Sequence, residues 1–227
     1  FGFRFNDSDF TLIKDINGLK DIVNDLNGKY ALSGDVDAAA TSGAGYNGGA
    51  GFIPLGNAGA SFTGVVNGLG NTISNLYINR PTTDNVGFIG KADGANISNI
   101  GFVNSNFTGQ GQVGGVIGLM KNGKLTNSFL QSSQINGLGE VGGAVGHLEV
   151  DNLSYAQVTN TFFNGSLTTT TGGSTGGLLG IVFGSGSNYG DILIQNNQAN
   201  AVINSASGNA GGLIGNIPLY GAVRVNV

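Results

Sequence analysis

The feature that most constrains this chain is a glycine-rich hexad that recurs five times. A typical copy is Val113-Gly114-Gly115-Val116-Ile117-Gly118, with an apolar pair before the last glycine. The copies occupy residues 85–90, 113–118, 141–146, 175–180 and 210–215, and their last glycines are 28, 28, 34 and 35 residues apart. A pattern that keeps its order over such a length predicts a repeat architecture.

A second pattern, an aliphatic residue followed by Ser or Thr and then Asn, lies between the hexads. It reads Ile73-Ser74-Asn75, Ile97-Ser98-Asn99, Leu125-Thr126-Asn127 and Val158-Thr159-Asn160, with a degraded copy at Ile194-Gln195-Asn196. The apolar runs are short, rich in β-branched and aromatic residues, and bounded by Gly and Asn, which is typical of strands and not of helices. The sequence therefore predicts a single-domain, all-β fold, a right-handed parallel β-helix.

The repeated asparagines have a predicted structural role, because Asn tolerates left-handed backbone geometry and its amide can bond to the Asn of the next coil. We expect an internal corner ladder; the alternative is a set of surface-turn asparagines. The ladder would comprise Asn75, Asn99, Asn127 and Asn160. For the hexad glycines we expect positive φ and close approach between coils.

The first 61 residues follow a different pattern and are predicted to form an N-terminal cap, with the coils occupying residues 62–227 of the same continuous domain. A short strand at 10–13 precedes an amphipathic helix at about 15–27, whose apolar face would include Leu19, Ile22 and Val23. Asp15 or Asn17 would cap this helix and Gly28 would end it. Such a helix would cover the exposed end of the stack.

Composition excludes several classes of protein. Charged residues are 10% of the chain and the net charge is −4, so no basic patch for nucleic acid is expected. The chain has no Cys and no long apolar run, which excludes disulfides, thiol chemistry and membrane insertion of this segment. The abrupt start at Phe1 and the alternating strand at 223–227 favour a monomeric fragment of a longer chain that continues into further coils.

The hexads resemble the GLUG motif, and residues 30–41, 47–56 and 62–76 resemble the lead-in of filamentous-haemagglutinin-type bacterial adhesins. The resemblance covers about residues 10–215, although the family more often has His where Asn71 stands. It implies a right-handed parallel β-helix in a large protein that is secreted or exposed on the bacterial surface, often through two-partner export. It also implies adhesion to host cells, other bacteria or a matrix. Immunoglobulin A proteases share the motif, outside their catalytic domain.

Catalytic and metal-binding residues are scarce. The best local constellation is His147, Glu149 and Asp151, which we interpret as a solvated loop, since glycoside hydrolysis needs a supported carboxylate pair. No zinc motif is present, and no cofactor is expected. Asp35 and Asp37 alternate on a strand beside a glycine-rich loop and would offer calcium two carboxylates, but they lack a calcium-binding loop motif. The sequence therefore predicts a protein that is not an enzyme.

Binding without chemistry is the predicted function, through amide and hydroxyl groups and exposed aromatic rings. The partner would be a glycan or protein on a host-cell or bacterial surface. Weak ligand-contact candidates in predicted loops are Tyr46, Tyr155, Tyr189 and Tyr220. Possible glycosylation sites are Asn6, Asn96, Asn106, Asn152 and Asn164, each in an Asn-x-Ser/Thr triplet. An adhesive module, a structural stalk and an accessory domain of a protease-like enzyme remain open.

Overall fold

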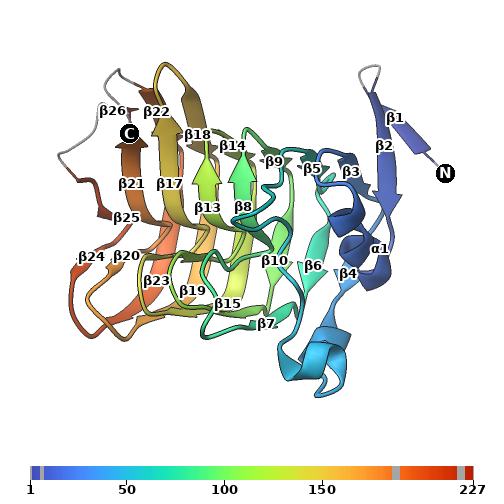
Figure 1. The fold of residues 1–227 in the computed structure, drawn as a ribbon, viewed down its shortest axis with the longest axis horizontal. Coiled ribbons are helices and arrows are strands. Elements are labelled where there is room, and N and C mark those ends of the chain that lie inside the picture. The colour runs from blue at the N-terminus through green and yellow to red at the C-terminus, as the bar shows by residue number, and fades with distance from the viewer. Residues whose placement is uncertain (1, 6–7, 186–189, 219–222, 227) are drawn as a thin grey trace.

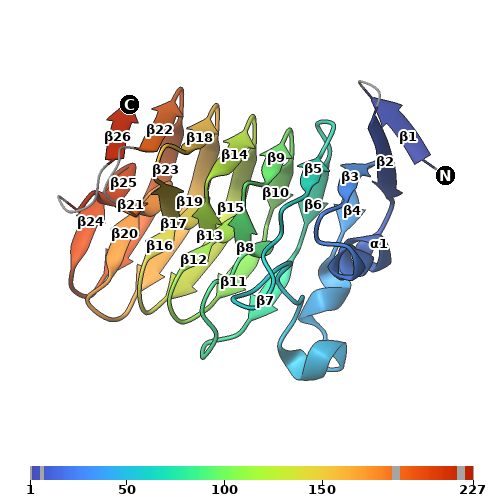
Figure 2. The same ribbon diagram turned by 45° about the horizontal axis from the view of Figure 1, so that its top comes forward.

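The chain forms a parallel β-solenoid of about six turns in a computed structural model that describes residues 2–5, 8–185, 190–218 and 223–226 (Figure 1). Four sheets run along the stack. In each of them a strand pairs with its counterpart from the next coil, as Figure 2 shows most clearly. The predicted fold class is confirmed.

The strands of the four sheets have the following bounds. The nine-stranded sheet contains β1 (Gly2–Phe5), β2 (Ser8–Ile13), β3 (Lys29–Leu32), β5 (Val65–Asn67), β9 (Asn96–Ser98), β14 (Gly123–Thr126), β18 (Tyr155–Thr159), β22 (Gly190–Gln195) and β26 (Val223–Asn226). The eight-stranded sheet contains β4 (Val36–Asp37), β6 (Thr72–Ser74), β7 (Tyr77–Asn79), β10 (Gly101–Val103), β11 (Asn106–Thr108), β15 (Phe129–Gly137), β19 (Phe162–Thr169) and β23 (Gln198–Ser205). The four-stranded sheet contains β12 (Val113–Gly114), β16 (Val141–Gly142), β20 (Ser174–Gly176) and β24 (Asn209–Gly211). The five-stranded sheet contains β8 (Ile89–Asp93), β13 (Ile117–Lys121), β17 (Val145–Asp151), β21 (Leu179–Ser185) and β25 (Ile214–Asn216).

The glycine hexads stack on one another at the corner between the four-stranded and five-stranded sheets. Val113 pairs with Val141 and Ile117 with Val145, and the same register continues through the later copies. At its start the first copy is shifted by one residue: Val86, its second residue, pairs with Val113, the first residue of the next copy. The fifth residues, Ile89 and Ile117, pair with each other as in the later copies.

Close approach, and not left-handed geometry, explains the hexad glycines. None of them has positive φ, so that part of the sequence expectation is wrong. A Cβ on Gly114 would lie 2.6 Å from the amide nitrogen of Gly146 in the next coil, and one on Gly142 would lie equally close to that of Gly180. A side chain at these positions would push the coils apart.

The core is a column of inward-facing side chains. Along the eight-stranded sheet Phe102 pairs with Ile73 and Leu130, and all three are fully buried. The Phe102 ring lies 5.4 Å from that of Phe88, a residue of the first glycine-rich repeat that leads into β8. The inner faces of different sheets therefore share one core.

The helix begins as predicted but is shorter. Asp15 accepts hydrogen bonds from the amides of Asn17 and Gly18 at the start of α1 (Ile16–Asp21), and η1 (Ile22–Asn24) follows as a 3₁₀ turn. Leu19 and Ile22 are buried, whereas Val23 is 51% exposed, because the tighter winding of the 3₁₀ turn rotates it off the apolar face.

The cap is part of the sheets. Strand β2 pairs in parallel with β3, β3 with β5, and β4 with β6, so no break in pairing coincides with residue 61. Helix α1 lies at the N-terminal end of the stack, between strands β2 and β3 along the chain (Figure 1). The 3₁₀ turns η2 (Ala39–Ser42) and η3 (Tyr46–Gly49) bulge from the next coil.

Candidate functional site

Asparagine amides form a ladder at the corner between the nine-stranded and eight-stranded sheets, on the outer side of the corner and not internally as predicted, since Asn127 and Asn160 are exposed. Asn127 Nδ2 donates to Asn99 Oδ1 at 3.2 Å, and Asn160 Nδ2 donates to Asn127 Oδ1 at 2.9 Å. Asn99 Nδ2 in turn donates to Asn67 Oδ1 at 3.1 Å. Asn99, Asn127 and Asn160 have φ of 54°, 50° and 51°, so each combines a left-handed backbone with a ladder bond.

Asn75 does not belong to this ladder, which corrects the sequence alignment. Its Oδ1 accepts from Asn104 Nδ2 at 2.7 Å and its Nδ2 donates to Asp37 Oδ1 at 2.9 Å, within a second corner ladder. Ile73 pairs with Phe102, and it is Val66 that pairs with Ile97. Both corners need a left-handed polar residue, so the Ile-Ser-Asn pattern fits either of them equally well.

The carboxylates considered for calcium already accept hydrogen bonds from protein groups, including groups of the next coil. Asp35 Oδ1 accepts from the Thr72 amide at 2.7 Å, and Asp37 Oδ1 accepts from Asn75 and from the Ala39 amide. The hydrogen bond from Asn75 is the main cause that lowers the pKa of Asp37. The two side chains therefore serve as end points of inter-coil bonds, and in the described part of the chain no group of three potential metal ligands occurs.

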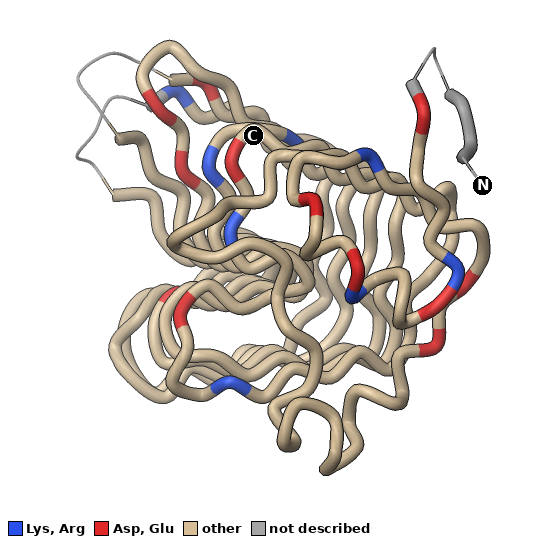
Figure 3. Tube along the Cα trace, turned by 45° about the vertical axis from the view of Figure 1, so that its right-hand side comes forward, with Lys and Arg blue, Asp and Glu red and all other residues tan. Residues whose placement is uncertain are grey.

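His147, Glu149 and Asp151 lie on strand β17, not in a solvated loop, and alternate on its outward side. Strand β13 pairs with β17 on one side and with β8 on the other, so Lys121 lies beside both Glu149 and Asp93. We call the outward side chains of β8, β13, β17 and β21 the charged face. Other charged positions gather in the N-terminal cap between Lys14 and Lys29, and the rest are spread along an otherwise uncharged trace (Figure 3).

Polar groups of the charged face bond to one another. Lys121 Nζ lies 3.1 Å from Asp151 Oδ2, and Asp151 also accepts hydrogen bonds from Ser185 and Asn122. Burial acts to raise the pKa of Asp151, but the hydrogen bonds from Lys121, Ser185 and Asn122 lower it overall. A carboxylate held in this way is a structural anion.

His147 is also enclosed. Both ring nitrogens are buried without a hydrogen-bond partner, and Nδ1 is 3.6 Å from Glu140 Oε2, which is longer than a hydrogen bond. Interaction with His147 and the bond from Gln112 lower the pKa of Glu140 against the effect of burial. Phe183 packs edge-on against the imidazole at 6.1 Å. These contacts leave the imidazole nitrogens inaccessible to a substrate.

A different surface lies on the eight-stranded sheet, which we call the uncharged face. It consists of the outward side chains of β7, β11 and the second halves of β15, β19 and β23. One row along the stack runs Tyr77, Asn106, Gln134, Ser166 and Val202, and the next runs Asn79, Thr108, Asn136, Thr168 and Asn204. No Asp, Glu, Lys or Arg occurs in either row.

The polar side chains of the uncharged face have unused hydrogen-bonding capacity. In the part of the chain that the structure describes, the side chains of Tyr77, Asn106, Thr108, Asn136 and Thr168 make no hydrogen bond with other protein groups. The Asn106 Oδ1 atom is buried and unpartnered, in contrast to the ladder amides.

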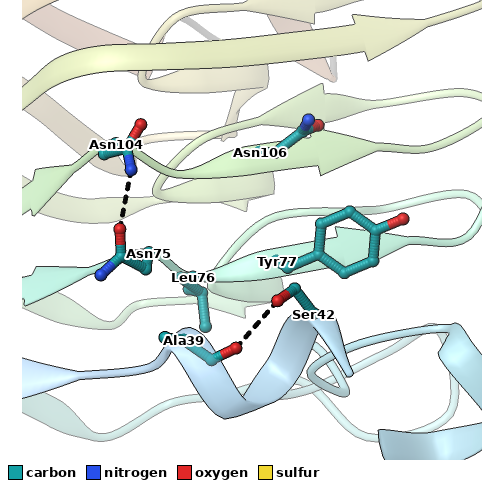
Figure 4. Close-up of a pocket in the computed structure, with 7 residues that line it drawn as sticks. All are labelled: Ala39, Ser42, Asn75, Leu76, Tyr77, Asn104 and Asn106. Carbon is teal, nitrogen blue, oxygen red and sulfur yellow. Dashed lines mark hydrogen bonds between the residues drawn. The ribbon is translucent and has the colours of Figure 1, made fainter. Parts of the chain in front are cut away.

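A hollow of about 260 Å³ opens at the N-terminal end of this face (Figure 4). Tyr77 and Asn106 lie on neighbouring strands, and Ser42 of η2 lies beside the Tyr77 ring. The Tyr77 amide donates to Thr41 Oγ1 at 2.9 Å, and its carbonyl accepts from the Phe52 amide. Backbone contacts on two sides thus fix the strand that carries the aromatic ring.

A second hollow of about 140 Å³ lies further along the same face. Its lining includes Thr108, Asn136, Thr168 and Leu138, none of them charged. A third hollow, of about 350 Å³, lies between β2, α1 and β3. There the Tyr30 hydroxyl already donates to the Asp25 carbonyl, so its polar group is used internally.

The tyrosines proposed from sequence are spread out. Tyr46 begins η3, where burial raises the pKa of its hydroxyl, and Tyr155 begins strand β18 and not a loop, with 41% of its surface exposed. Tyr189 and Tyr220 lie outside the described residues. The structure does not bring Tyr46 and Tyr155 together, and it points instead to Tyr77, which sequence reasoning missed.

The glycosylation candidates also differ in their setting. Asn96, Asn106 and Asn164 lie within strands, Asn152 lies in the turn after β17, and Asn6 lies outside the described residues. Asn152 is exposed, and so is the neighbouring Leu153, at 82%. Modification of these asparagines stays a prediction, which an intact mass of native material would test.

The longer C-terminal repeats place most of their extra residues at one corner. Asn127 follows Gly118 by nine positions, whereas Asn160 follows Gly146 by fourteen and Asn196 follows Gly180 by sixteen. The additions lengthen β17, β18, β21 and β22, which project beyond the earlier strands in Figure 1. An ion pair between Arg224 and Asp191 joins β26 to β22.

Comparison with known proteins supports the fold. No protein-family model matches the chain. A segment of 110 residues, 47% of the chain, is 38% identical to Halomucin from Haloquadratum walsbyi, of which it covers 1%. The crystal structure of a candidate immunoglobulin A1 protease from Bacteroides ovatus superimposes with a TM-score of 0.58 and 16% identity, over 97% of this chain and 78% of that chain. At that identity the likeness shows the fold alone.

None of the helices in the described part of the chain has the length and apolar character that a membrane span requires.

Proposed function

We propose that this chain is a non-catalytic binding segment of a secreted or cell-surface protein, and that it attaches that protein to other cells or to a matrix. The observation that carries the proposal is the uncharged face, a rigid strand array whose outward amides and hydroxyls bond to no other protein group. Similarity to Halomucin supports an extracellular location. The resemblance to filamentous-haemagglutinin-type adhesins supports attachment as the role.

The absence of catalysis is part of the proposal. The Asp151 carboxylate is held by Lys121, Asn122 and Ser185. The imidazole of His147 is enclosed by Glu140 and Phe183. Such groups stabilise the coil and have no free proton-transfer partner in a cleft.

A structural stalk or an accessory domain of an immunoglobulin A protease-like enzyme is the second candidate. It is favoured by one observation, that the structure from Bacteroides ovatus matches almost the whole of this chain. A stalk needs no ligand, so the two candidates differ in a measurable property.

Binding to intact cells separates them. The purified chain, labelled with a fluorophore, is added to bacterial and epithelial cells, and the unlabelled chain is used as competitor. Attachment predicts saturable binding that the competitor displaces. Linear, non-displaceable binding on every cell type contradicts the proposal and favours the stalk. Incubation with immunoglobulin A1, followed by mass spectrometry, checks that the chain cleaves no peptide bond.

A further inference from the structure

The two hollows of the uncharged face are neighbours on one strand. Asn106 lines the first and Thr108 the second, and both project outward from β11. Residues two apart on a strand are separated by about 6.6 Å, so the hollows follow one another without an intervening element. The next strand continues the second hollow through Asn136.

We infer that these hollows form one binding groove for an uncharged oligosaccharide, with the Tyr77 ring as its aromatic platform. This inference rests on the proposed attachment function and gives that function a site and a ligand class. It adds Tyr77, Asn106, Thr108 and Asn136 as ligand-contacting residues.

The lining has the two kinds of group that a sugar needs. A pyranose ring presents an apolar C–H face, which packs on an aromatic ring, and a rim of hydroxyls that both donate and accept hydrogen bonds. Amides offer both donors and an acceptor, and threonine hydroxyls offer both as well. Leu138, which is exposed, supplies an apolar contact at the second hollow. The first hollow, about 260 Å³, is smaller than typical drug-sized pockets and suits a single sugar unit.

The state of the polar groups favours a ligand over a purely structural role. At the ladders the amides of Asn99, Asn127 and Asn160 bond to each other, and on the charged face Lys121 and Asp151 pair. On the uncharged face the corresponding groups have no such partners, and Asn106 Oδ1 is buried without one. A buried acceptor without a hydrogen-bond partner is unfavourable, so a donor supplied by a ligand would stabilise it.

Charge argues for a neutral ligand. None of the residues that line the two hollows is charged. The nearest cation along the chain is Arg80, which follows β7 and whose Nε donates to the Phe52 carbonyl at 3.3 Å. Sulfated, sialylated and uronic-acid sugars normally need exposed Arg or Lys, which this groove does not offer.

The test uses the full chain with defined oligosaccharides. Calorimetric titration with cellohexaose, chitohexaose and mannohexaose as neutral probes, and with hexagalacturonic acid as the charged probe, is performed on four proteins. These are the wild type, Tyr77→Ala, Thr108→Lys and the matched control Tyr155→Ala, whose exposed ring lies on β18. Circular dichroism checks that each is folded.

We expect at least one neutral hexasaccharide to bind and the charged one not to bind. Tyr77→Ala and Thr108→Lys should each weaken binding by about tenfold or more, and Tyr155→Ala by less than about twofold. If Tyr77→Ala is unfolded, Thr108→Lys and the ring-retaining Tyr77→Phe, which should bind within about threefold of the wild type, decide the question.

Several results would overturn the inference. Binding that is unchanged by both groove variants places the site elsewhere, and preference for hexagalacturonic acid contradicts the neutral ligand class. Saturable cell binding that is lost after protease treatment of the cells, with no oligosaccharide bound, identifies a protein partner and leaves the attachment function intact. Absence of both cell binding and oligosaccharide binding removes the proposed function itself.

Discussion

The uncharged and charged faces are built by the same coils on the same core, yet they use their outward polar groups differently. Inward residues such as Phe107 and Leu148 are fully buried under both. On the charged face unlike charges lie side by side on neighbouring strands, as at Asp93, Lys121 and Glu149, and Lys121 pairs with Asp151 of the next coil. On the uncharged face the rows of amides and hydroxyls bond to no other protein group. Polar groups that are paired within the wall stabilise stacking, and those left unpaired are available to a ligand.

The comparison of the two faces assumes that they share one core. Phe102→Ala tests this assumption and has the largest expected effect on stability. The substitution removes a fully buried ring that packs between Ile73 and Leu130 and reaches Phe88, so the free energy of unfolding should fall by about 3–5 kcal/mol. Hydrogen exchange should increase together in peptides from both faces. Phe102→Leu should lose less, about 1 kcal/mol. Faster exchange confined to β10 and β15 would mean that the faces unfold independently.

Asn127→Ala tests whether paired amides stabilise and unpaired amides do not. Alanine loses the bonds to Asn99 and Asn160 and is strained at φ 50°, so chemical denaturation should show a loss of about 2–3 kcal/mol. Asn127→Gly keeps the backbone geometry and should recover part of this loss. The matched control is Asn106→Ala on the uncharged face, where the loss should stay below about 1 kcal/mol. Equal losses at Asn127 and Asn106 would contradict the distinction.

The sequence predicted the repeating architecture because its cause is local. A hexad glycine such as Gly142 leaves no room for a side chain, and Asn127 needs left-handed geometry; both requirements appear directly as residue identity. The pairing register of the coils was harder to predict, because Asn75 fits either corner equally well. Only the long-range pairing of Ile73, with Phe102 and not with Ile97, decides between the two corners. The strand at His147 was missed because its outward residues are polar and read as a loop.

The sequence indicated the candidate groove only through segments that lack charged residues. No charged residue occurs between Asn99 and Met120, between Asn127 and Gly139, or between Asn160 and Gly190. These charge-free segments contain β10, β11, β15 and β19 of the eight-stranded sheet and β12 and β20 of the four-stranded sheet, and the last segment also contains β21. Which of their side chains face outward, and that Tyr77 comes to lie beside Asn106, depends on pairing between residues 29 positions apart.

Asp151→Asn tests, through the pH dependence of stability, whether the charge pair stabilises the charged face. The pKa of Asp151 is lowered in the folded protein, so its stabilising effect is complete above the ordinary carboxyl value of about 3.9 and is lost as the pH falls through the lower folded value. Because 39% of the side chain is exposed, the loss at pH 7 should be about 1 kcal/mol or less. Urea unfolding at pH 7 and pH 3 measures it. The difference between wild type and variant should shrink at pH 3; a constant difference would show that the charge pair is not its source.

Thr168→Val on the uncharged face should have the smallest effect. Its hydroxyl has no protein partner, it lies outward on β19 between Asn136 and Asn204, and valine has the same shape and favours strands. The free energy of unfolding should change by less than about 0.5 kcal/mol, and by the same amount at pH 7 and pH 3, because no ionisable group faces this position. A loss above 1 kcal/mol would show that the hydroxyl takes part in an inter-coil bond. The uncharged face would then be stabilised in the same way as the charged one, and its polar groups would be unavailable to a ligand.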